Sequence, residues 1–458
     1  MQQRRALDEK KINRELLIGN LQTPPWWTPT VIVLTFFVII GWILIGIMIN
    51  KGLGVTGLSR PVYWGLFIAT FVFWVGISHA GIMISAILRL TQAEWRRPVT
   101  RAAELLTVFS LMTALLFPLI HEGRPWRAYW YAPYDFARGI WPSVRSPLVW
   151  DPAAIGTYLT GSTLFLYVAL LPDLGILRDR SVGWQKPLYT VLALGWRGNP
   201  RQWRLQTVAG VLLSALMLPI FVSVHSIVSW DFAITPAVEG WHSTIFAPYF
   251  VIGAVHSGVS AVVTMMALMR WLWKWDNYIR PEHFDALARL LIVVATAWLG
   301  FTFLELLFAV YGRDGPEIAL REMQIFQWPW AALFIVFLLT GYFIPVTLWM
   351  FKRVRNNIAM MFWTSILVNV GMWLERFLIV VPSLARKQPF VFTWDNYTPS
   401  AIEIYLLFWS VCWVALLMLL FARFFPLVPL FEAKESQAFT TEIKIGRASV
   451  PAVLREHE

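Results

Sequence analysis

Long apolar runs separated by short polar segments make up most of this chain. Ten runs each approach or exceed the roughly 20 apolar residues that a helix needs to cross a bilayer. They cover residues 30–50, 62–88, 103–121, 153–172, 207–230, 244–269, 287–311, 328–351, 357–381 and 401–423. The runs are continuously apolar instead of alternating, which favours helices over the strands of a membrane barrel. The pattern predicts an all-α integral membrane protein with about ten transmembrane helices.

A short motif in the second and sixth runs indicates an internal repeat. Residues 76–81 and 253–258 both read Gly-x-x-His-x-Gly, with histidines at His79 and His256. Small residues one turn from each histidine would let neighbouring helices approach closely. We expect two tandem four-helix bundles, spans 2–5 (about 61–231) and spans 6–9 (about 244–382), flanked by spans 1 and 10. The membrane domain would then cover 30–424, between tails at 1–29 and 425–458.

Composition and charge support a membrane protein. Hydrophobic residues make up 58% of the 458 positions and charged residues 14%, against about 45–50% and about 25% in soluble proteins. A soluble enzyme is excluded. Of the 38 Lys and Arg residues, 27 lie on the side that carries both termini, ten lie on the other, and Arg376 lies within the ninth span. The positive-inside rule therefore predicts that both termini lie in the cytoplasm, and we expect a multi-pass protein of the bacterial inner membrane.

Other features narrow the possible chemistry. Basic residues do not gather on one face with interleaved aromatics, so we expect a lipid bilayer and no nucleic acid as partner. The single cysteine, Cys412, lies within the last run and cannot form a cysteine-ligated zinc or iron–sulfur site, or attach a c-type haem. The basic residues 1–29 lack a cleavable signal sequence and are expected to form a cytoplasmic tail.

Ionisable residues at membrane depth are the candidate functional groups, because each costs about 2.5–3.5 kcal/mol or more in hydrocarbon. The deep ones are His79, His225, His256, Glu305, Glu375, Arg376 and Glu403. At the outer boundary lie His121, Arg124, Asp151, Asp231 and His242. Most fall in the outer half of the bilayer, which suits a pocket open to the outside or a proton path.

The roles of these residues have functional and structural interpretations. We expect His79, His225, His256, Glu305 and Glu375 to belong to a proton path, although packing roles explain single histidines equally well. Glu403 could simply complement a helix dipole. A carboxylate near an imidazole raises its basicity, so His121 and Asp151 are the candidate catalytic pair. No metal site is expected.

Two other functions fit part of this pattern. A secondary transporter or proton channel would also need charges within the membrane, but its site would usually lie on broken helices near the midplane. A di-haem cytochrome b would need four facing histidines, and only three lie within the spans.

The outer segment 122–150 is rich in Trp, Tyr and Pro. With the preceding histidine it reads His121-Glu122-Gly123-Arg124-Pro125-Trp126 at its start and Arg145-Ser146-Pro147-Leu148-Val149-Trp150-Asp151 at its end. It suits the lipid interface or the docking of an external partner. The segment and the predicted spans resemble the NrfD-like family, the membrane subunits of polysulfide reductase and its relatives. They look most like the larger quinol-binding membrane subunit of bacterial alternative complex III.

The resemblance implies a subunit of a quinol-oxidising complex that is inactive alone. It would bind menaquinol or ubiquinol near the outer face, hold no haem or iron–sulfur cluster itself, and release or translocate protons. Implied partners are an extrinsic iron–sulfur subunit on the outer face, multihaem cytochrome c subunits and a second NrfD-like membrane subunit. Carried over by position, the quinol-binding residues would be His121, Arg124, Asp151, Asp231 and Arg376.

Overall fold

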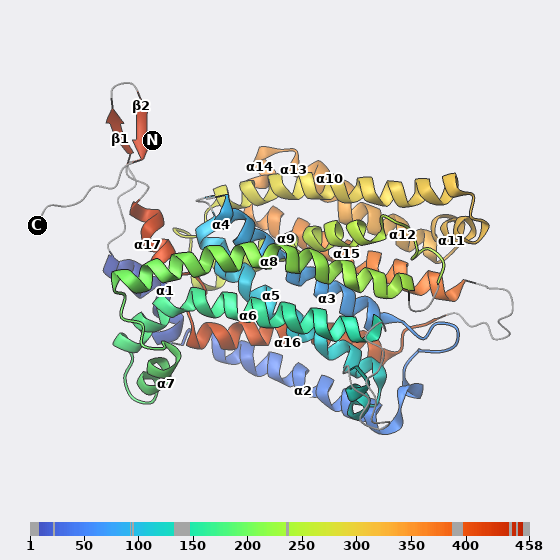
Figure 1. Cartoon of the computed structure of the whole chain (residues 1–458), viewed down its shortest axis with the longest axis horizontal. Coiled ribbons are helices and arrows are strands. Elements are labelled where there is room, and N and C mark those ends of the chain that lie inside the picture. The colour runs from blue at the N-terminus through green and yellow to red at the C-terminus, as the bar shows by residue number, and fades with distance from the viewer. Residues whose placement is uncertain are drawn as a thin grey trace, which may run out of the picture.

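The computed structural model of the chain is a bundle of long helices that run side by side (Figure 1). It describes residues 9–21, 23–91, 93, 96–131, 147–234, 238–386, 397–438, 442–445 and 448–451. Within them, ten helical segments are long and apolar enough to span a membrane. The predicted all-α membrane fold is confirmed.

Ten spans form the membrane domain, two of them interrupted. Eight spans consist of one helix each: α2 (Trp27–Lys51), α5 (Arg97–Glu122), α6 (Pro147–Arg180), α8 (Pro200–Ile234), α9 (Phe246–Trp273), α10 (Pro281–Gly312), α15 (Ile358–Ala385) and α16 (Ala401–Phe424). The second span joins α3 (Leu66–Ile82), the π-helix η2 (Met83–Ile87) and α4 (Leu88–Leu90). The eighth joins α12 (Trp330–Leu338), the π-helix η5 (Leu339–Phe343) and α13 (Ile344–Trp349).

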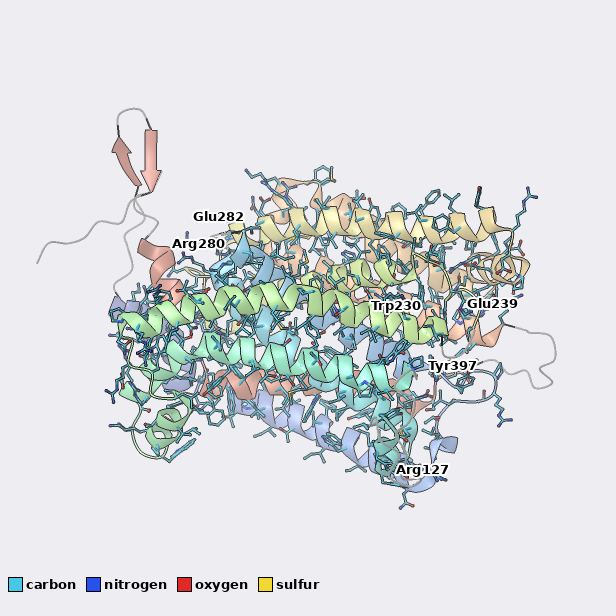
Figure 2. All side chains as sticks on the ribbon, in the orientation of Figure 1. Arg127, Trp230, Glu239, Arg280, Glu282 and Tyr397 are labelled. Carbon is cyan, nitrogen blue, oxygen red and sulfur yellow. The ribbon has the colours of Figure 1, made fainter. Side chains whose placement is uncertain are left out.

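Shorter elements lie at the two ends of the bundle. They are α1 (Glu9–Leu21), the 3₁₀ helices η1 (Leu53–Val55) and η4 (Pro125–Tyr131), α7 (Gln185–Leu192), α11 (Gly315–Phe326), α14 (Lys352–Arg355), α17 (Leu430–Ala438) and the hairpin strands β1 (Glu442–Ile445) and β2 (Ala448–Pro451). Following the predicted orientation, we call the end with α1 and α17 the inner end and the opposite end the outer end. Figure 2 shows Arg280 and Glu282 toward the inner end, and Arg127, Glu239 and Tyr397 toward the outer end.

Several helices are longer than the apolar runs that predicted them. The run at 153–172 lies within α6, which has 34 residues, and the run at 207–230 lies within α8, which has 35. Hydropathy marks only the part of a helix that lies in hydrocarbon, and the hydrogen-bonded backbone continues into the polar interface. The helix ends therefore bring charged residues next to the spans.

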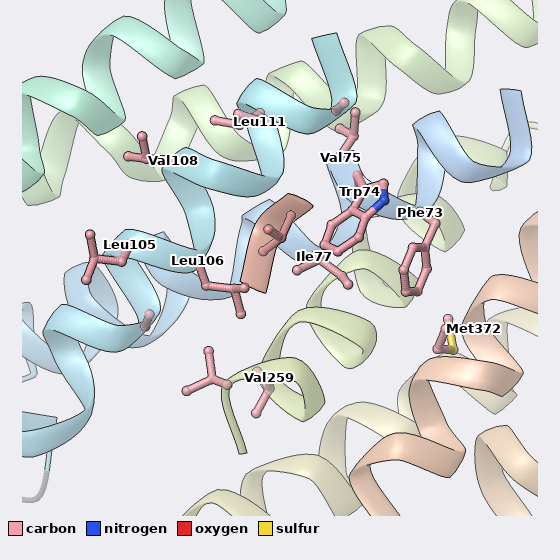
Figure 3. Packing of buried hydrophobic residues seen from close by; sticks show 14 of the residues in the cluster. Phe73, Trp74, Val75, Ile77, Leu105, Leu106, Val108, Leu111, Val259 and Met372 are labelled. Carbon is pink, nitrogen blue, oxygen red and sulfur yellow. The ribbon is translucent and has the colours of Figure 1, made fainter. Parts of the chain in front are cut away.

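Close approach of the helices depends on glycine at a few positions. In the bundle centre, α3 packs against α5, α9 and α15, and Figure 3 shows apolar side chains of these helices meeting around Trp74. A Cβ at Gly76 would lie 3.2 Å from the Ser257 hydroxyl of α9, and one at Gly81 would overlap the Ala103 carbonyl of α5. The motif glycines thus hold α3 against two neighbours. The division into two repeats stays a prediction.

The first and last spans pair at the side of the bundle. Gly41 of α2 leaves room for the Trp409 ring, whose Nε1 donates to the Val38 carbonyl at 3.2 Å. At the start of α16, Glu403 accepts hydrogen bonds from the backbone N–H groups of Ser400 and Gly57, at 2.8 and 2.7 Å. Glu403 is therefore part of a helix cap that also fixes the preceding outer loop.

The tails pack on the inner end. Ile12, Leu16 and Leu17 of α1 are buried, and α1 contacts α16 and α17. The hairpin of β1 and β2 lies beyond α17, outside the membrane domain, so it does not alter the fold class.

Replacing Gly81 with Val should separate α3 from α5, because the new Cβ would meet the Ala103 backbone, which cannot rotate away. We expect a loss of about 1–3 kcal/mol of stability, measured as a lower unfolding temperature of the detergent-solubilised protein. Gly46 is the matched control, because a Cβ there has no neighbour within 4 Å. Equal unfolding temperatures for Gly81→Val and Gly46→Val would contradict this packing.

Candidate quinol site and polar interior

Two carboxyl groups meet at the outer end of the first predicted repeat. Asp151 lies in the first turns of α6 and Asp231 in the last turn of α8, and their side chains contact each other. Both Asp231 oxygens and Asp151 Oδ1 have no hydrogen-bond partner of good geometry among the described residues. Two ionised carboxylates in one site repel each other, so a proton on one of them is favoured. A helix N-terminus favours a negative charge and a C-terminus disfavours it. The helix dipoles therefore favour the proton on Asp231 and the negative charge on Asp151.

Other polar groups lie at the same end of the bundle as this pair. His121 and Glu122 end α5, and the left-handed Gly123 (φ 66°) turns the chain into η4. The buried His121 Nδ1 and Glu122 Oε2 atoms have no hydrogen-bond partner among the described residues. Burial, together with the negative charges of Glu122 and Asp151, raises the pKa of Tyr131, so its phenol stays a hydrogen-bond donor. We call His121, Glu122, Tyr131, Asp151 and Asp231 the outer cluster.

A second polar group lies deeper, where the two predicted repeats meet. His79 of α3 and His225 of α8 have ring centroids 4.5 Å apart. His79 directs Nδ1 to the Val75 carbonyl (2.6 Å) and Nε2 to the Phe221 carbonyl (2.9 Å). Carbonyl oxygens only accept, so both bonds are made at once only when both ring nitrogens carry hydrogen. His79 can thus hold an extra proton without moving.

The polar contacts continue from His225 into the second predicted repeat. The His225 nitrogens have no hydrogen bond of good geometry among the described residues, and the ring lies 5.7 Å from that of Phe250. The guanidinium of Arg376, on α15, packs over the same Phe250 ring, 4.5 Å from its centroid. The apolar ring of Phe250 therefore lies between the imidazole of His225 and the guanidinium of Arg376 and contacts both.

Arg376 is paired within α15. Its Nη2 lies 3.5 Å from Glu375 Oε2, and the other Glu375 oxygen accepts from Trp298 Nε1 at 2.7 Å. Both charged side chains are buried. An unpaired charge in hydrocarbon is costly. The pairing of Arg376 with Glu375 therefore lets this part of α15 be buried against α9 and α10.

A small cavity lies between Glu375 and Arg321, toward the outer end of the bundle. It is lined by Tyr249, Glu305, Arg321, Gln324 and Glu375, among others, and its volume of about 40 Å³ is enough for about three water molecules. Glu305 accepts from the Ser243 hydroxyl and pairs with Arg321 Nη2 at 3.2 Å. Arg321 also reaches Glu317 at 3.4 Å. The polar chain, which we define as His79, His225, Arg376, Glu375, Glu305 and Arg321, thus ends at the outer end.

His256 lies beside this chain. Pro345 has no N–H, so the carbonyl of Gly341 loses its normal helical donor. His256 Nε2 takes that place at 2.9 Å, and its ring stacks on that of Trp298 at 5.7 Å. His256 therefore satisfies the free Gly341 carbonyl in the interrupted eighth span. It also packs against Trp298, the indole that donates a hydrogen bond to Glu375.

The histidine geometry does not fit a haem between His79 and His256. Axial ligation needs a free nitrogen on each ring, whereas both His79 nitrogens face backbone carbonyls.

Comparison with protein families decides the assignment. The family described as Polysulphide reductase, NrfD matches residues 54–387, from η1 to just past α15. The chain belongs to the NrfD family. The matched segment includes the outer cluster and the polar chain.

Curated relatives of this NrfD-family chain match most of its length. A putative dimethyl sulfoxide reductase membrane subunit of Halobacterium salinarum is 24% identical over 425 residues, 86% of this chain and 90% of the relative. A selenate reductase subunit of Mesobacillus selenatarsenatis is 23% identical over 420 residues, 88% and 94% of the two chains. The integral membrane subunit of menaquinone reductase of Nitratidesulfovibrio vulgaris is 24% identical over 428 residues, 86% and 90%. This NrfD-family protein is therefore a multi-pass membrane protein similar to membrane subunits of reductases.

The five predicted quinol-site residues do not all lie together. Asp151 and Asp231 are in contact, and His121 is at the same end of the bundle. Arg124 is exposed. Arg376 lies deeper, with the polar chain, because it precedes the outer end of α15 by nine residues, about 14 Å.

Two groups of charged residues were not predictable as buried pairs. Arg321 lies on α11, a short amphipathic helix in an outer connection. In the sequence, only its spacing of four residues from Glu317 indicates an ion pair, and such a pair would be expected on the surface. At the inner end, Arg101 Nη2 pairs with Asp173 Oδ2 at 3.1 Å, with both side chains buried. These two residues flank apolar runs, so the sequence pattern assigns them to connections. They lie inside the bundle because α5 and α6 extend beyond the runs.

Proposed function

We propose that this NrfD-family chain is the membrane subunit of a quinol-oxidising electron-transfer complex, and that it binds menaquinol or ubiquinol at the outer cluster. The observation that carries the proposal is the carboxyl pair of Asp151 and Asp231, which lies at the same end of the bundle as His121, a histidine with an unpaired buried nitrogen. The relatives support a redox role, because each is named as part of a reductase, and one reductase acts on menaquinone.

Oxidation of a quinol to a quinone releases two protons and two electrons. In this proposal Asp151 accepts the hydrogen bond and then the proton of one hydroxyl group, and His121 Nδ1 accepts from the other. Asp231 keeps its proton and donates to Asp151, which limits the negative charge in the empty site. A positioned base of this kind contributes about 10²–10⁴-fold to a proton transfer.

The electrons need an acceptor in another subunit. We propose an iron–sulfur cluster of an extrinsic subunit that docks on the outer end. The exposed aromatic rings of η4 support this, since Trp126 is 61% and Tyr129 40% exposed, and aromatic residues are enriched at protein interfaces. The aromatic outer loop further favours an assembly like alternative complex III, with multihaem cytochrome c and a second NrfD-like subunit. The charge distribution favours cytoplasmic termini, and the resemblance to bacterial alternative complex III favours a bacterial inner membrane.

We also propose that the polar chain carries protons to the outer surface. It contains four of the five predicted proton-path residues, His79, His225, Glu305 and Glu375, and His256 supports it through Trp298. The water-sized cavity between Glu375 and Arg321 gives the outer part of the route a medium in which protons move.

Asp151→Asn should slow quinol oxidation by the assembled complex about 100-fold, because the amide cannot accept the proton. Asp231→Asn should slow it about ten-fold or less, because an amide resembles the neutral acid already present there. His121→Ala should resemble Asp151→Asn. Turnover is measured with a soluble quinol and an artificial acceptor, after co-purification has shown that the subunits assemble.

Glu403→Gln is the matched control, since it changes a buried carboxyl group at the same end that serves a helix cap. Wild-type turnover in Asp151→Asn would remove this residue from the site. Faster reduction of quinone than oxidation of quinol, under matched driving force, would reverse the proposed direction.

Glu375→Gln should lower the number of protons that reach the outer medium per quinol oxidised. The neutral amide interrupts the polar chain, whereas the outer cluster still releases the protons of the quinol itself. A pH-sensitive dye outside vesicles that contain the complex measures the release. Glu403→Gln should leave it unchanged. Unchanged release in Glu375→Gln would contradict the route, and proton flux without quinol would favour the alternative of a transporter or channel.

A further inference from the structure

The connection between α6 and α8 folds back along the membrane domain. The Tyr167 hydroxyl of α6 donates to the Leu192 carbonyl at the end of α7, at 2.6 Å. Tyr167 precedes the end of α6 by 13 residues, about 20 Å, and helical side chains lean toward the N-terminus, away from that end. The apolar run of α6 ends at residue 172, so this contact lies about 8 Å inside the hydrocarbon region.

Two further contacts hold the connection beside the membrane domain, at the inner edge of the hydrocarbon. The Tyr189 hydroxyl donates to the Phe424 carbonyl at the end of α16, at 2.7 Å. Arg178 Nη1 donates to the Trp196 carbonyl at 2.7 Å, and the Trp196 ring is seated against Gly175, where a Cβ would lie 2.6 Å from it. The connection is therefore a built element that lies beside the inner ends of two spans.

This element exposes a row of large apolar side chains. Trp184, Leu188 and Val191 are spaced four and three residues apart, so they share one face of α7. Their side chains are 65%, 37% and 71% exposed. Val182 and Leu194, at the two ends, are 82% and 70% exposed. In water such a row would be costly, whereas at the edge of the hydrocarbon it is favourable.

Exposed cations flank the apolar row. They are Arg180, Lys186, Arg197, Arg201 and Arg204, and no salt bridge joins any of them to a described residue. Residues 181–204 contain no Asp or Glu, so the positive charge has no counterpart within the segment. Arginine binds phosphate oxygens through paired N–H groups.

We infer that residues 180–204, the interfacial segment, bind anionic phospholipids of the inner leaflet. The apolar face of α7 enters the acyl-chain region, and the five cations contact phosphate groups at headgroup level. Lipid fits this surface better than a partner protein does, because the end of α7 lies at acyl-chain depth and cations predominate beside it. The nearby exposed acid, Asp179, is paired with Arg178 at 2.8 Å. This lipid site is independent of the proposed quinol chemistry.

The depth of α7 is tested with nitroxide labels on the full-length chain in nanodiscs. Cys412 is the single cysteine and is buried, so Cys412→Ser gives the background for Val191→Cys. We expect the label at 191 to be reached by oxygen and shielded from a water-soluble nickel complex, like one at the lipid-facing Val293 (67% exposed). A label at Lys352 gives the aqueous reference. If the nickel complex reached the label at position 191, or if neither oxygen nor the nickel complex reached it, the inference would be overturned.

Lipid selectivity is tested with a charge-matched pair of variants. Arg197→Gln, Arg201→Gln and Arg204→Gln together should lower the preference for spin-labelled phosphatidylglycerol over phosphatidylcholine about three-fold or more, because each cation near an anionic surface adds to binding. Lys274→Gln, Lys352→Gln and Arg353→Gln remove the same charge from other exposed inner sites and should leave the preference unchanged. An equal loss in both variants would show a general charge effect and contradict a site on the interfacial segment.

Discussion

A charged side chain inside a bilayer must find its partner within the protein, and several helices of this chain are placed by that requirement. Arg376 pairs with Glu375 where α15 meets α9 and α10, Arg321 pairs with Glu305 where α11 closes the outer end, and Arg101 pairs with Asp173 at the inner end. Removing one member of a buried pair leaves an unpaired charge, which typically costs about 3–5 kcal/mol. The same groups that fix the packing are therefore the ones available for proton chemistry.

In the proposed function, the outer cluster binds quinol and the polar chain conducts protons. The outer cluster lies at helix ends, where the opposite dipoles of α6 and α8 favour a negative charge on Asp151 and a proton on Asp231. The polar chain lies deeper and contains groups that are nearly all engaged, apart from His225. Phe250 contacts both His225 and Arg376, so proton movement along the chain would require water or side-chain motion at that ring. Quinol binding and proton conduction thus depend on different residues, and α8 carries members of both sets, Asp231 and His225.

Much of the fold was predictable from the sequence, and most of the pairings were not. Continuous apolar runs mark the ten spans, because hydrocarbon excludes unpaired polar groups. The role of Pro345 in freeing the Gly341 carbonyl was also predictable, but nothing in the sequence indicates that His256, 85 residues away, supplies the donor. The family resemblance groups Arg376 with Asp231 in one quinol site. In the structure the Arg376 guanidinium packs over the ring of Phe250, on α9. The position of Arg376 depends on how α15 crosses α9, which the sequence does not indicate. The contact of Asp151 with Asp231 agrees with their expected grouping, whereas their roles remain proposals.

Photoaffinity labelling with an azidoquinone tests the quinol site at the outer cluster most directly, because it locates the quinone ring without relying on turnover. The assembled complex in its native membrane is irradiated with the probe, and labelled peptides are identified by mass spectrometry. We expect labelling within α5 and η4 near His121 or at the ends of α6 and α8, competed by excess quinol and lost in Asp151→Asn. Competable labelling confined to the cavity between Tyr249 and Arg321, or to another protein of the complex, would contradict a quinol site at the outer cluster.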